Sequence, residues 1–206
     1  NTISIIDPLF TLPLLLAVVL AARMRKPVLA RFGLAWAVVY MGLGLVQREA
    51  AEEMGYALAA QRGHQPIRLE AKPSFANILV WKTVYETEDR YYVDGVRATL
   101  RPRVFAGNTV EKLVLDRDMP WLDPQSQQAR DVERFRWFSN GYIARDPVYS
   151  NRVMDIRYSL LPNEIDPLWS IELKPEAALR DHALYKTHRD GGPDRASVLW
   201  EMITGR

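Results

Sequence analysis

The chain lacks cysteine altogether and contains only 3 histidines among its 206 residues. The absence of cysteine excludes disulfide bonds, thiolate metal sites and a cysteine nucleophile. His182 and His188 are spaced so that they would not share one face of a helix, and His64 lies beside a predicted helix end. A zinc site built from these histidines is therefore not favoured. A phosphate-binding loop, a Gly-x-Ser-x-Gly elbow and a dinucleotide fingerprint are also missing.

The sequence also lacks an excess of either positive or negative charge. Lys and Arg number 27 and Asp and Glu number 25, which gives a net charge of +2, and the two signs are interspersed. Nucleic-acid-binding proteins usually present a basic face, so the composition predicts no nucleic-acid partner.

The N-terminal part of the sequence contains two long uncharged runs. No charged residue separates Asp7 from Arg23, and none separates Arg31 from Arg48. Each run approaches the roughly 20 apolar residues that cross a bilayer, and neither has an amphipathic period. The pattern predicts a two-helix transmembrane hairpin over residues 1–48, with spans at about 4–22 and 32–47. A buried helical hairpin inside a water-soluble protein is the alternative.

The flanking charges predict how such a hairpin is oriented. The connection between the runs is basic and contains Arg23, Arg25, Lys26 and Arg31. The second run is followed by acidic residues, namely Glu49, Glu52 and Glu53. Because short basic loops stay in the cytoplasm, the remaining domain is expected outside it. The predicted location is the bacterial inner (cytoplasmic) membrane, multi-pass, with a periplasmic or external soluble domain. Since Asn1 begins directly in apolar sequence, we also expect the chain to be part of a longer protein.

Beyond the hairpin, the sequence predicts a helical extension over 49–64, ended by Gly63, and a soluble α+β domain over 65–206. Runs of β-branched and aromatic residues predict strands, and a charged stretch between the first two predicts a hairpin turn. The strands are expected at 78–85, 91–100, 142–144, 152–159 and 168–173, with the turn at 86–90.

Helices are predicted on one face and at the end of this domain. Apolar residues at a spacing of three follow Asp123 until Asn140-Gly141, which predicts one packed helix. Residues 176–187 and 196–204 are predicted as C-terminal helices. The expected fold is an α+β membrane protein, in which a two-helix transmembrane hairpin precedes a soluble antiparallel β domain with one packed helix and C-terminal helices.

Asp7 is the first candidate for chemistry. A carboxylate at the start of a transmembrane run is costly unless it has a partner. Asp7 is therefore either a metal ligand or relay group among helices, or an interfacial acid that ends the span. Asp155 and Arg157 are two positions apart on a predicted strand, so they are expected on one face as an ion pair.

Four blocks of the sequence resemble one protein family. Their residues are Ile5-Ile6-Asp7-Pro8-Leu9-Phe10-Thr11-Leu12-Pro13-Leu14-Leu15, Pro73-Ser74 with Asn77, Trp81 and Lys82, Arg136-Trp137-Phe138-Ser139-x-Gly141-Tyr142, and Asp155-x-Arg157-Tyr158. The second block resembles the family's segment Pro-Thr-Pro-x-Asn-x-x-x-Trp-Arg. In order and spacing the blocks resemble the YdjM-type family of LexA-binding, inner membrane-associated proteins, which are described as membrane-bound metal-dependent hydrolases.

The resemblance implies that the chain is the C-terminal part of a metal-dependent hydrolase that acts on phospholipid or another envelope substrate. It implies a divalent metal, such as zinc, in the full-length protein, with Asp7 as the ligand that this chain contributes. The family's His-Arg-Gly-x-Thr-His-Ser motif, on an upstream helix, has no counterpart here. In the soluble domain, Asn77, Trp81, Asp155 and Arg157 are the candidate catalytic residues.

Two other functions remain open on the sequence. The chain is either such a hydrolase or a non-enzymatic, membrane-tethered binding or assembly module, whose partners include the lipid bilayer. A regulatory partner of a cytoplasmic repressor is a third possibility, which conflicts with the predicted orientation. Substrate, metal identity and oligomeric state are not determined by the sequence.

Overall fold

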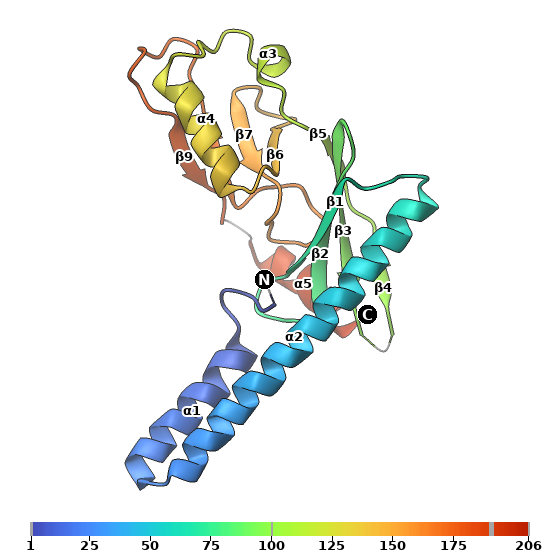
Figure 1. The fold of residues 1–206 in the computed structure, drawn as a ribbon, viewed down its shortest axis with the longest axis vertical. Coiled ribbons are helices and arrows are strands. Elements are labelled where there is room, and N and C mark those ends of the chain that lie inside the picture. Colours follow the sequence, from blue (N-terminus) through green and yellow to red (C-terminus); the bar gives the residue numbers. More distant parts are fainter. Residues whose placement is uncertain (1, 100, 190–191, 206) are drawn as a thin grey trace.

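The structure is a computed structural model, and it describes residues 2–99, 101–189 and 192–205. The protein is α+β: two N-terminal helices are followed by two antiparallel β-sheets and a C-terminal helix. In Figure 1 the helical hairpin projects away from the two sheets, and only the second helix continues onto the β domain. The α+β class predicted from the sequence is therefore confirmed, whereas the sequence did not indicate that the strands divide into two sheets.

Helices α1 (Pro8–Met24) and α2 (Pro27–Gln61) form the hairpin. A proline lies in the first turn of each helix, and Arg25 makes the turn between them with a left-handed φ of 53°. The two helices pack closely at Gly33, where an added Cβ would lie 3.0 Å from the Cβ of Ala17. The predicted second span and the predicted helical extension are thus one continuous helix of 35 residues.

Small residues fix the distal half of α2 to the first sheet. Ala51, Gly55 and Ala59 are buried at a spacing of four, which places them on one face of the helix. An added Cβ on Gly55 would lie 2.9 Å from the side chain of Leu69, so the helix can approach the sheet only without a side chain there. Gly63 follows with a φ of 73°, which agrees with the predicted helix end.

The first sheet contains β1 (Arg68–Pro73), β2 (Val80–Glu86), β3 (Arg90–Arg97), β4 (Arg103–Phe105) and β5 (Thr109–Glu111). The order is β1-β2-β3-β4, and β5 pairs with β3. The hairpin turn predicted between β2 and β3 is confirmed by the pairing of Glu86 with Tyr91. The predicted strand end at Leu100 lies outside the described residues. Strand β1 was not predicted, because its charged residues alternate with few apolar ones.

The second sheet has the order β6 (Ile143–Arg145), β7 (Arg152–Asp155), β8 (Trp169–Glu172) and β9 (Leu184–Thr187). The single turn α3 (Leu115–Asp118) precedes helix α4 (Gln127–Phe138), and α5 (Gly192–Thr204) ends the chain. The predicted packed helix is α4, although its N-cap is Ser126, whose hydroxyl accepts from the amide of Ala129 at 3.1 Å, and not Asp123.

The helix predicted over 176–187 is wrong. Residues 184–187 pair with β8 over four registered positions, from Trp169 with Thr187 to Glu172 with Leu184. The free edge of β8 offers backbone hydrogen bonds that an isolated helix of this length cannot replace, so pairing with the sheet overrides the local preference. The helix predicted over 196–204 lies within α5.

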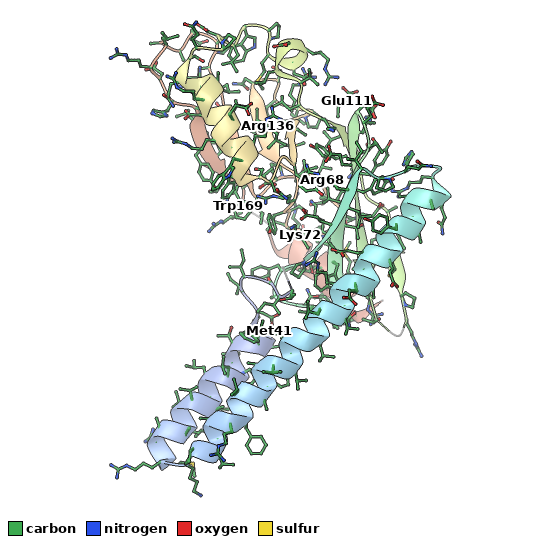
Figure 2. The ribbon with its side chains drawn as sticks, viewed as in Figure 1. Met41, Arg68, Lys72, Glu111, Arg136 and Trp169 are labelled. Atoms are coloured by element: carbon green, nitrogen blue, oxygen red, sulfur yellow. The ribbon has the colours of Figure 1, made fainter. Side chains whose placement is uncertain are left out.

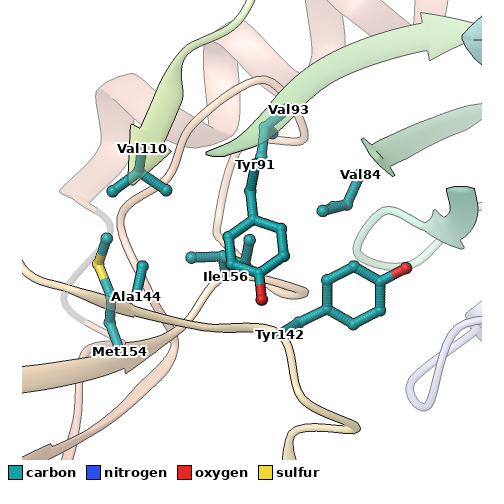
Figure 3. Packing of buried hydrophobic residues seen from close by; sticks show 8 residues of the cluster. All are labelled: Val84, Tyr91, Val93, Val110, Tyr142, Ala144, Met154 and Ile156. Carbon is teal, nitrogen blue, oxygen red and sulfur yellow. The ribbon is translucent and has the colours of Figure 1, made fainter. Parts of the chain in front are cut away.

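A shared core joins the two sheets. Figure 3 shows this cluster, which contains Val84, Tyr91, Val93 and Val110 from the first sheet and Tyr142, Ala144, Met154 and Ile156 from the second half of the domain. The rings of Tyr91 and Tyr142 lie 5.6 Å apart at their centroids, and the Tyr91 hydroxyl donates to the carbonyl of Gly141 at 2.8 Å. The two sheets therefore form one packed unit and not two independent domains.

The hairpin itself exposes an unusual amount of apolar surface. Large apolar side chains are exposed all round it, namely Leu9, Leu12, Leu15, Leu16, Val18, Val19, Val28, Phe32, Leu34, Val38, Val39, Met41, Leu43, Leu45 and Val46. By length and composition, α2 is the one helix in the described part of the chain that could cross a membrane, and α1 is a shorter apolar helix. Water-soluble monomers rarely expose a contiguous apolar surface of this extent.

Candidate functional site

Asp7 is a helix cap that is bonded to a tyrosine. Its carboxylate is 2% exposed, accepts from the amide of Phe10 at 3.2 Å, and has both oxygens 2.9 Å from the hydroxyl of Tyr40. Within the described ranges, no three His, Asp or Glu side chains come together in a group that could hold a metal ion. The surroundings of Asp7 are thus those of a buried cap that joins α1 to α2, and its role as a metal ligand stays a prediction.

Asn77 uses its whole side chain within the β1–β2 turn. Its Oδ1 accepts from the amides of Leu79 and Val80 at 2.9 and 2.8 Å, and its Nδ2 donates to Ser74 Oγ and the Phe75 carbonyl at 2.8 and 3.0 Å. This is an Asx-type arrangement, in which a short amide side chain replaces backbone partners in a tight turn. Asn77 therefore shapes the turn, and its catalytic role stays a prediction.

Trp81 is fully buried on β2. Its indole N–H donates to the carbonyl of Ile78 at 2.9 Å, and its ring packs in a cluster with Tyr40, Ala51 and Val96. Two of these residues come from α2, so Trp81 lies in the contact between the long helix and the first sheet.

Asp155 and Arg157 form the ion pair that was predicted, at 2.7 Å, although β7 ends at Asp155. Asp155 also accepts from the backbone amide of Arg157 at 3.0 Å, and the guanidinium donates to the Phe138 carbonyl at 2.9 Å. The Asp155 carboxylate is completely buried. Of the four candidate catalytic residues, Arg157 also lines the pocket of about 390 Å³ that is described below.

The three histidines lie apart from one another. His64 Nδ1 lies 2.8 Å from the Tyr85 hydroxyl, His182 Nδ1 lies 2.9 Å from Asp131, and His188 Nε2 lies 2.7 Å from Ser170 Oγ. Each histidine therefore serves a different contact between neighbouring elements.

A pocket of about 390 Å³ lies at the base of the β domain, beside the start of the hairpin. Its walls come from the segment before α1, from the β1–β2 turn, from the segment after β7 and from the start of β8. The lining residues are Ile3, Ser4, Ile5, Ile6, Lys72, Pro73, Ser74, Phe75, Lys82, Arg157, Tyr158, Ser159, Leu160, Pro162, Leu168, Trp169 and Arg189. Figure 2 shows Lys72 on the first sheet and Trp169 on the second, both on the side of the domain that faces Met41 and the hairpin.

Apolar, hydroxyl and basic side chains make up this lining. The larger share is apolar, and the charged members, Lys72, Lys82, Arg157 and Arg189, are all basic. No acidic side chain is among the described residues that line it. A concave, mostly apolar site with a few convergent polar groups is the usual form of a small-molecule site. We refer to it below as the basal pocket.

Lys82 is the least exposed charged residue of the basal pocket. It is 3% exposed, and its ammonium donates to Ser159 Oγ at 2.8 Å and to the carbonyl of Glu164 at 2.7 Å. Burial lowers the pKa of Lys82 to about 7, and the carboxylates of Asp155, Glu164 and Asp166 offset only part of that effect. Lys82 was not among the site residues predicted from the sequence, although a lysine within the apolar strand ILVWKTVY was the available signal.

The lowered pKa of Lys82 predicts a pH dependence of stability. In the unfolded chain the lysine stays protonated up to its ordinary pKa of 10.5, whereas in the folded protein it loses its proton near pH 7. Between these values the unfolded state binds more protons, so the free energy of unfolding rises with pH, by at most about 1.4 kcal/mol per pH unit. We expect Lys82→Met to remove this slope between about pH 7 and 9.5.

The measurement is denaturant unfolding of both proteins over that pH range in detergent. The difference between their curves isolates Lys82, because the buried tyrosines titrate only at higher pH: burial raises the pKa of Tyr91 to about 12. Parallel curves for the two proteins would mean that Lys82 titrates as an ordinary exposed lysine.

The fold and the basal pocket define an α+β protein with an apolar helical hairpin and a basic, apolar-walled pocket. Comparison of the chain with models of protein families, with curated proteins and with solved structures finds no match in any of the three. The resemblance to the YdjM-type family, and the hydrolase activity that it implies, therefore stay predictions.

Proposed function

We propose that this protein is a membrane-anchored binding module, in which the hairpin holds the β domain at the bilayer surface and the basal pocket takes an amphiphilic ligand. The observation that carries the proposal is the position of the basal pocket. Ile3, Ile5 and Ile6 line it and directly precede α1, so its apolar wall is continuous with the apolar hairpin. A ligand whose apolar part lies in the bilayer can therefore reach the pocket without crossing water.

The dimensions of the hairpin support an anchor. Residues 27–46 of α2 are uncharged except for Arg31, and at 1.5 Å per residue they cover about 30 Å, the thickness of a hydrocarbon core. Arg48 and Glu52 follow and form an ion pair at 2.9 Å, as expected where a helix enters water. The basic connection near Arg25 and Lys26 favours a cytoplasmic location for the hairpin loop and an external β domain.

The junction between hairpin and domain is one uninterrupted helix with a charged anchor at its end. Beyond the apolar section, α2 continues without interruption across the first sheet. At its end, the Arg62 guanidinium donates to both oxygens of Asp94, at 2.6 and 2.8 Å, and Asp94 is buried on β3. In the proposed arrangement, the α2–sheet contact sets the height of the basal pocket above the bilayer.

A binding role is favoured over the predicted metal-dependent hydrolase because of what the candidate residues do. Asn77, Trp81 and Asp155 use their polar groups to hold the fold, and Asp7 caps α1 and bonds to Tyr40. None of them presents a free group to the basal pocket. The hydrolase remains a prediction that rests on the family resemblance.

Alkaline extraction of bacterial membranes tests the anchor. We expect the complete chain to stay in the membrane pellet at high pH, where peripheral proteins are released. The matched control is the double variant Leu34→Lys/Val38→Lys, which changes two exposed side chains of one α2 face. Each lysine costs about 2.5–3.5 kcal/mol at the centre of a spanning helix, so this variant should move to the soluble or aggregated fraction. Release of the wild-type chain as a soluble monomer would contradict the anchor.

A further inference from the structure

We propose that the basal pocket is selective for an anionic amphiphile and binds the phosphate of a lipid headgroup, with Lys82 as the buried cation that contacts it. This inference rests on the proposed membrane-anchored binding function and deepens it, because it names the chemical class of the ligand.

The charges of the pocket lining favour an anionic ligand. Its charged lining residues are all basic, yet they differ in how they are neutralised. Lys72 pairs with Glu70, and Arg157 pairs with Asp155 at 2.7 Å. Lys82 instead contacts a hydroxyl and a backbone carbonyl, which are neutral acceptors. The pocket therefore contains a buried amine without a contacting carboxylate in the described structure, and an anionic ligand would favour its protonated form and balance its charge.

Lys82 lines the pocket and has one N–H donor left for that ligand. An ammonium has three N–H donors, and the described structure uses two of them, to Ser159 and to Glu164. A phosphate oxygen can accept from the third. Burial strengthens such a charge-assisted hydrogen bond, since water competes little at a residue that is 3% exposed.

The apolar lining selects an amphiphile over a fully polar anion. Leu160, Leu168 and Trp169 line the pocket, and at its edge Ile5 and Phe75 are 82% and 54% exposed. These side chains would contact the glycerol carbons and the first methylene groups of a lipid. A pocket of about 390 Å³ has room for a headgroup and the start of the chains, while the remaining chain length stays in the bilayer.

Nucleophilic catalysis by Ser159 is a less favoured hypothesis for the same residues. The Ser159 hydroxyl donates to the carbonyl of Leu161 at 2.5 Å, and it accepts from Lys82. Its proton therefore points away from the amine that would have to remove it. The pair orders the ammonium for binding and does not activate the hydroxyl.

The test is calorimetric titration of the complete chain, held in a lipid-free amphipathic polymer, with short-chain probes below their critical micelle concentrations. The probes are dihexanoyl phosphatidic acid, dihexanoyl phosphatidylcholine and inorganic phosphate. We expect phosphatidic acid to bind at least about tenfold more tightly than either of the other two. Lys82→Met should weaken phosphatidic acid about tenfold to a hundredfold, as expected for the loss of one buried charge-assisted hydrogen bond.

Arg134→Gln is the matched control, because it removes one positive charge from an exposed position of α4 outside the pocket. It should leave the affinity for phosphatidic acid unchanged. Equal binding of both lipids, unaffected by Lys82→Met, would overturn the headgroup selectivity and leave the amphiphile-binding module intact. Equally tight binding of inorganic phosphate would overturn the lipid assignment. Failure of both lipids to bind would overturn the binding function as well.

Discussion

Trp81→Ala is expected to lower the free energy of unfolding by about 3–5 kcal/mol, the usual cost of deleting a fully buried tryptophan side chain. Trp81 is 0% exposed and packs against Tyr40 and Ala51 of α2, so the cavity would open at the contact between the hairpin helix and the first sheet. The surrounding strand cannot collapse into that space, because β2 is paired on both sides, with β1 and β3. Denaturant unfolding in detergent, followed by near-ultraviolet circular dichroism, measures the effect.

Two further tryptophan variants separate packing from chemistry. Trp137→Ala changes a ring that is 83% exposed, and it should alter stability by less than about 0.5 kcal/mol. Trp81→Phe keeps most of the packing and loses the hydrogen bond to Ile78, so an intermediate cost of about 1–2 kcal/mol is expected. If Trp81→Ala were as stable as Trp137→Ala, Trp81 would not hold the helix on the sheet. That outcome would favour the prediction that Trp81 is a catalytic residue.

The second large effect is expected for Asp155→Ala, which should cost about 3–5 kcal/mol because it leaves a charge in the interior without its partner. The Asp155 side chain is 0% exposed and that of Arg157 is 12% exposed, so water cannot replace the lost carboxylate. The exposed pair Glu133–Arg136 on α4 offers a control, since its acidic side chain is 60% exposed. Glu133→Ala should change stability by less than about 0.5 kcal/mol.

A double variant identifies the cause of this cost. If the unpaired Arg157 charge is responsible, then Asp155→Leu/Arg157→Met should be more stable than Asp155→Ala, although it removes more polar groups. A double variant that is less stable than Asp155→Ala would show that the hydrogen bonds of the pair, including that to Phe138, matter more than the charge.

The features that the sequence by itself determined are those set by local physics. The apolar runs on either side of Arg25 predicted two helices, because a run without charge and without an amphipathic period has no face for water. The helix ends at Gly63 and at Asn140-Gly141 follow from residues that tolerate positive φ, and these residues have φ values of 73°, 51° and 78°. The β2–β3 hairpin and α4 likewise depend on patterns contained within each segment.

The tertiary structure alone decided the features that depend on a distant partner. Residues 184–187 became β9 because the edge of β8 was free to pair with them, and β1 formed on the exposed edge of β2 despite its many charges. The candidate residues Asn77, Trp81 and Asp155 were chosen by type and block, yet their roles depend on which backbone groups the fold brings to them. The basal pocket joins Ile5, Lys82, Ser159 and Trp169 from segments far apart in the chain, and the burial that lowers the pKa of Lys82 exists only once those segments are packed together.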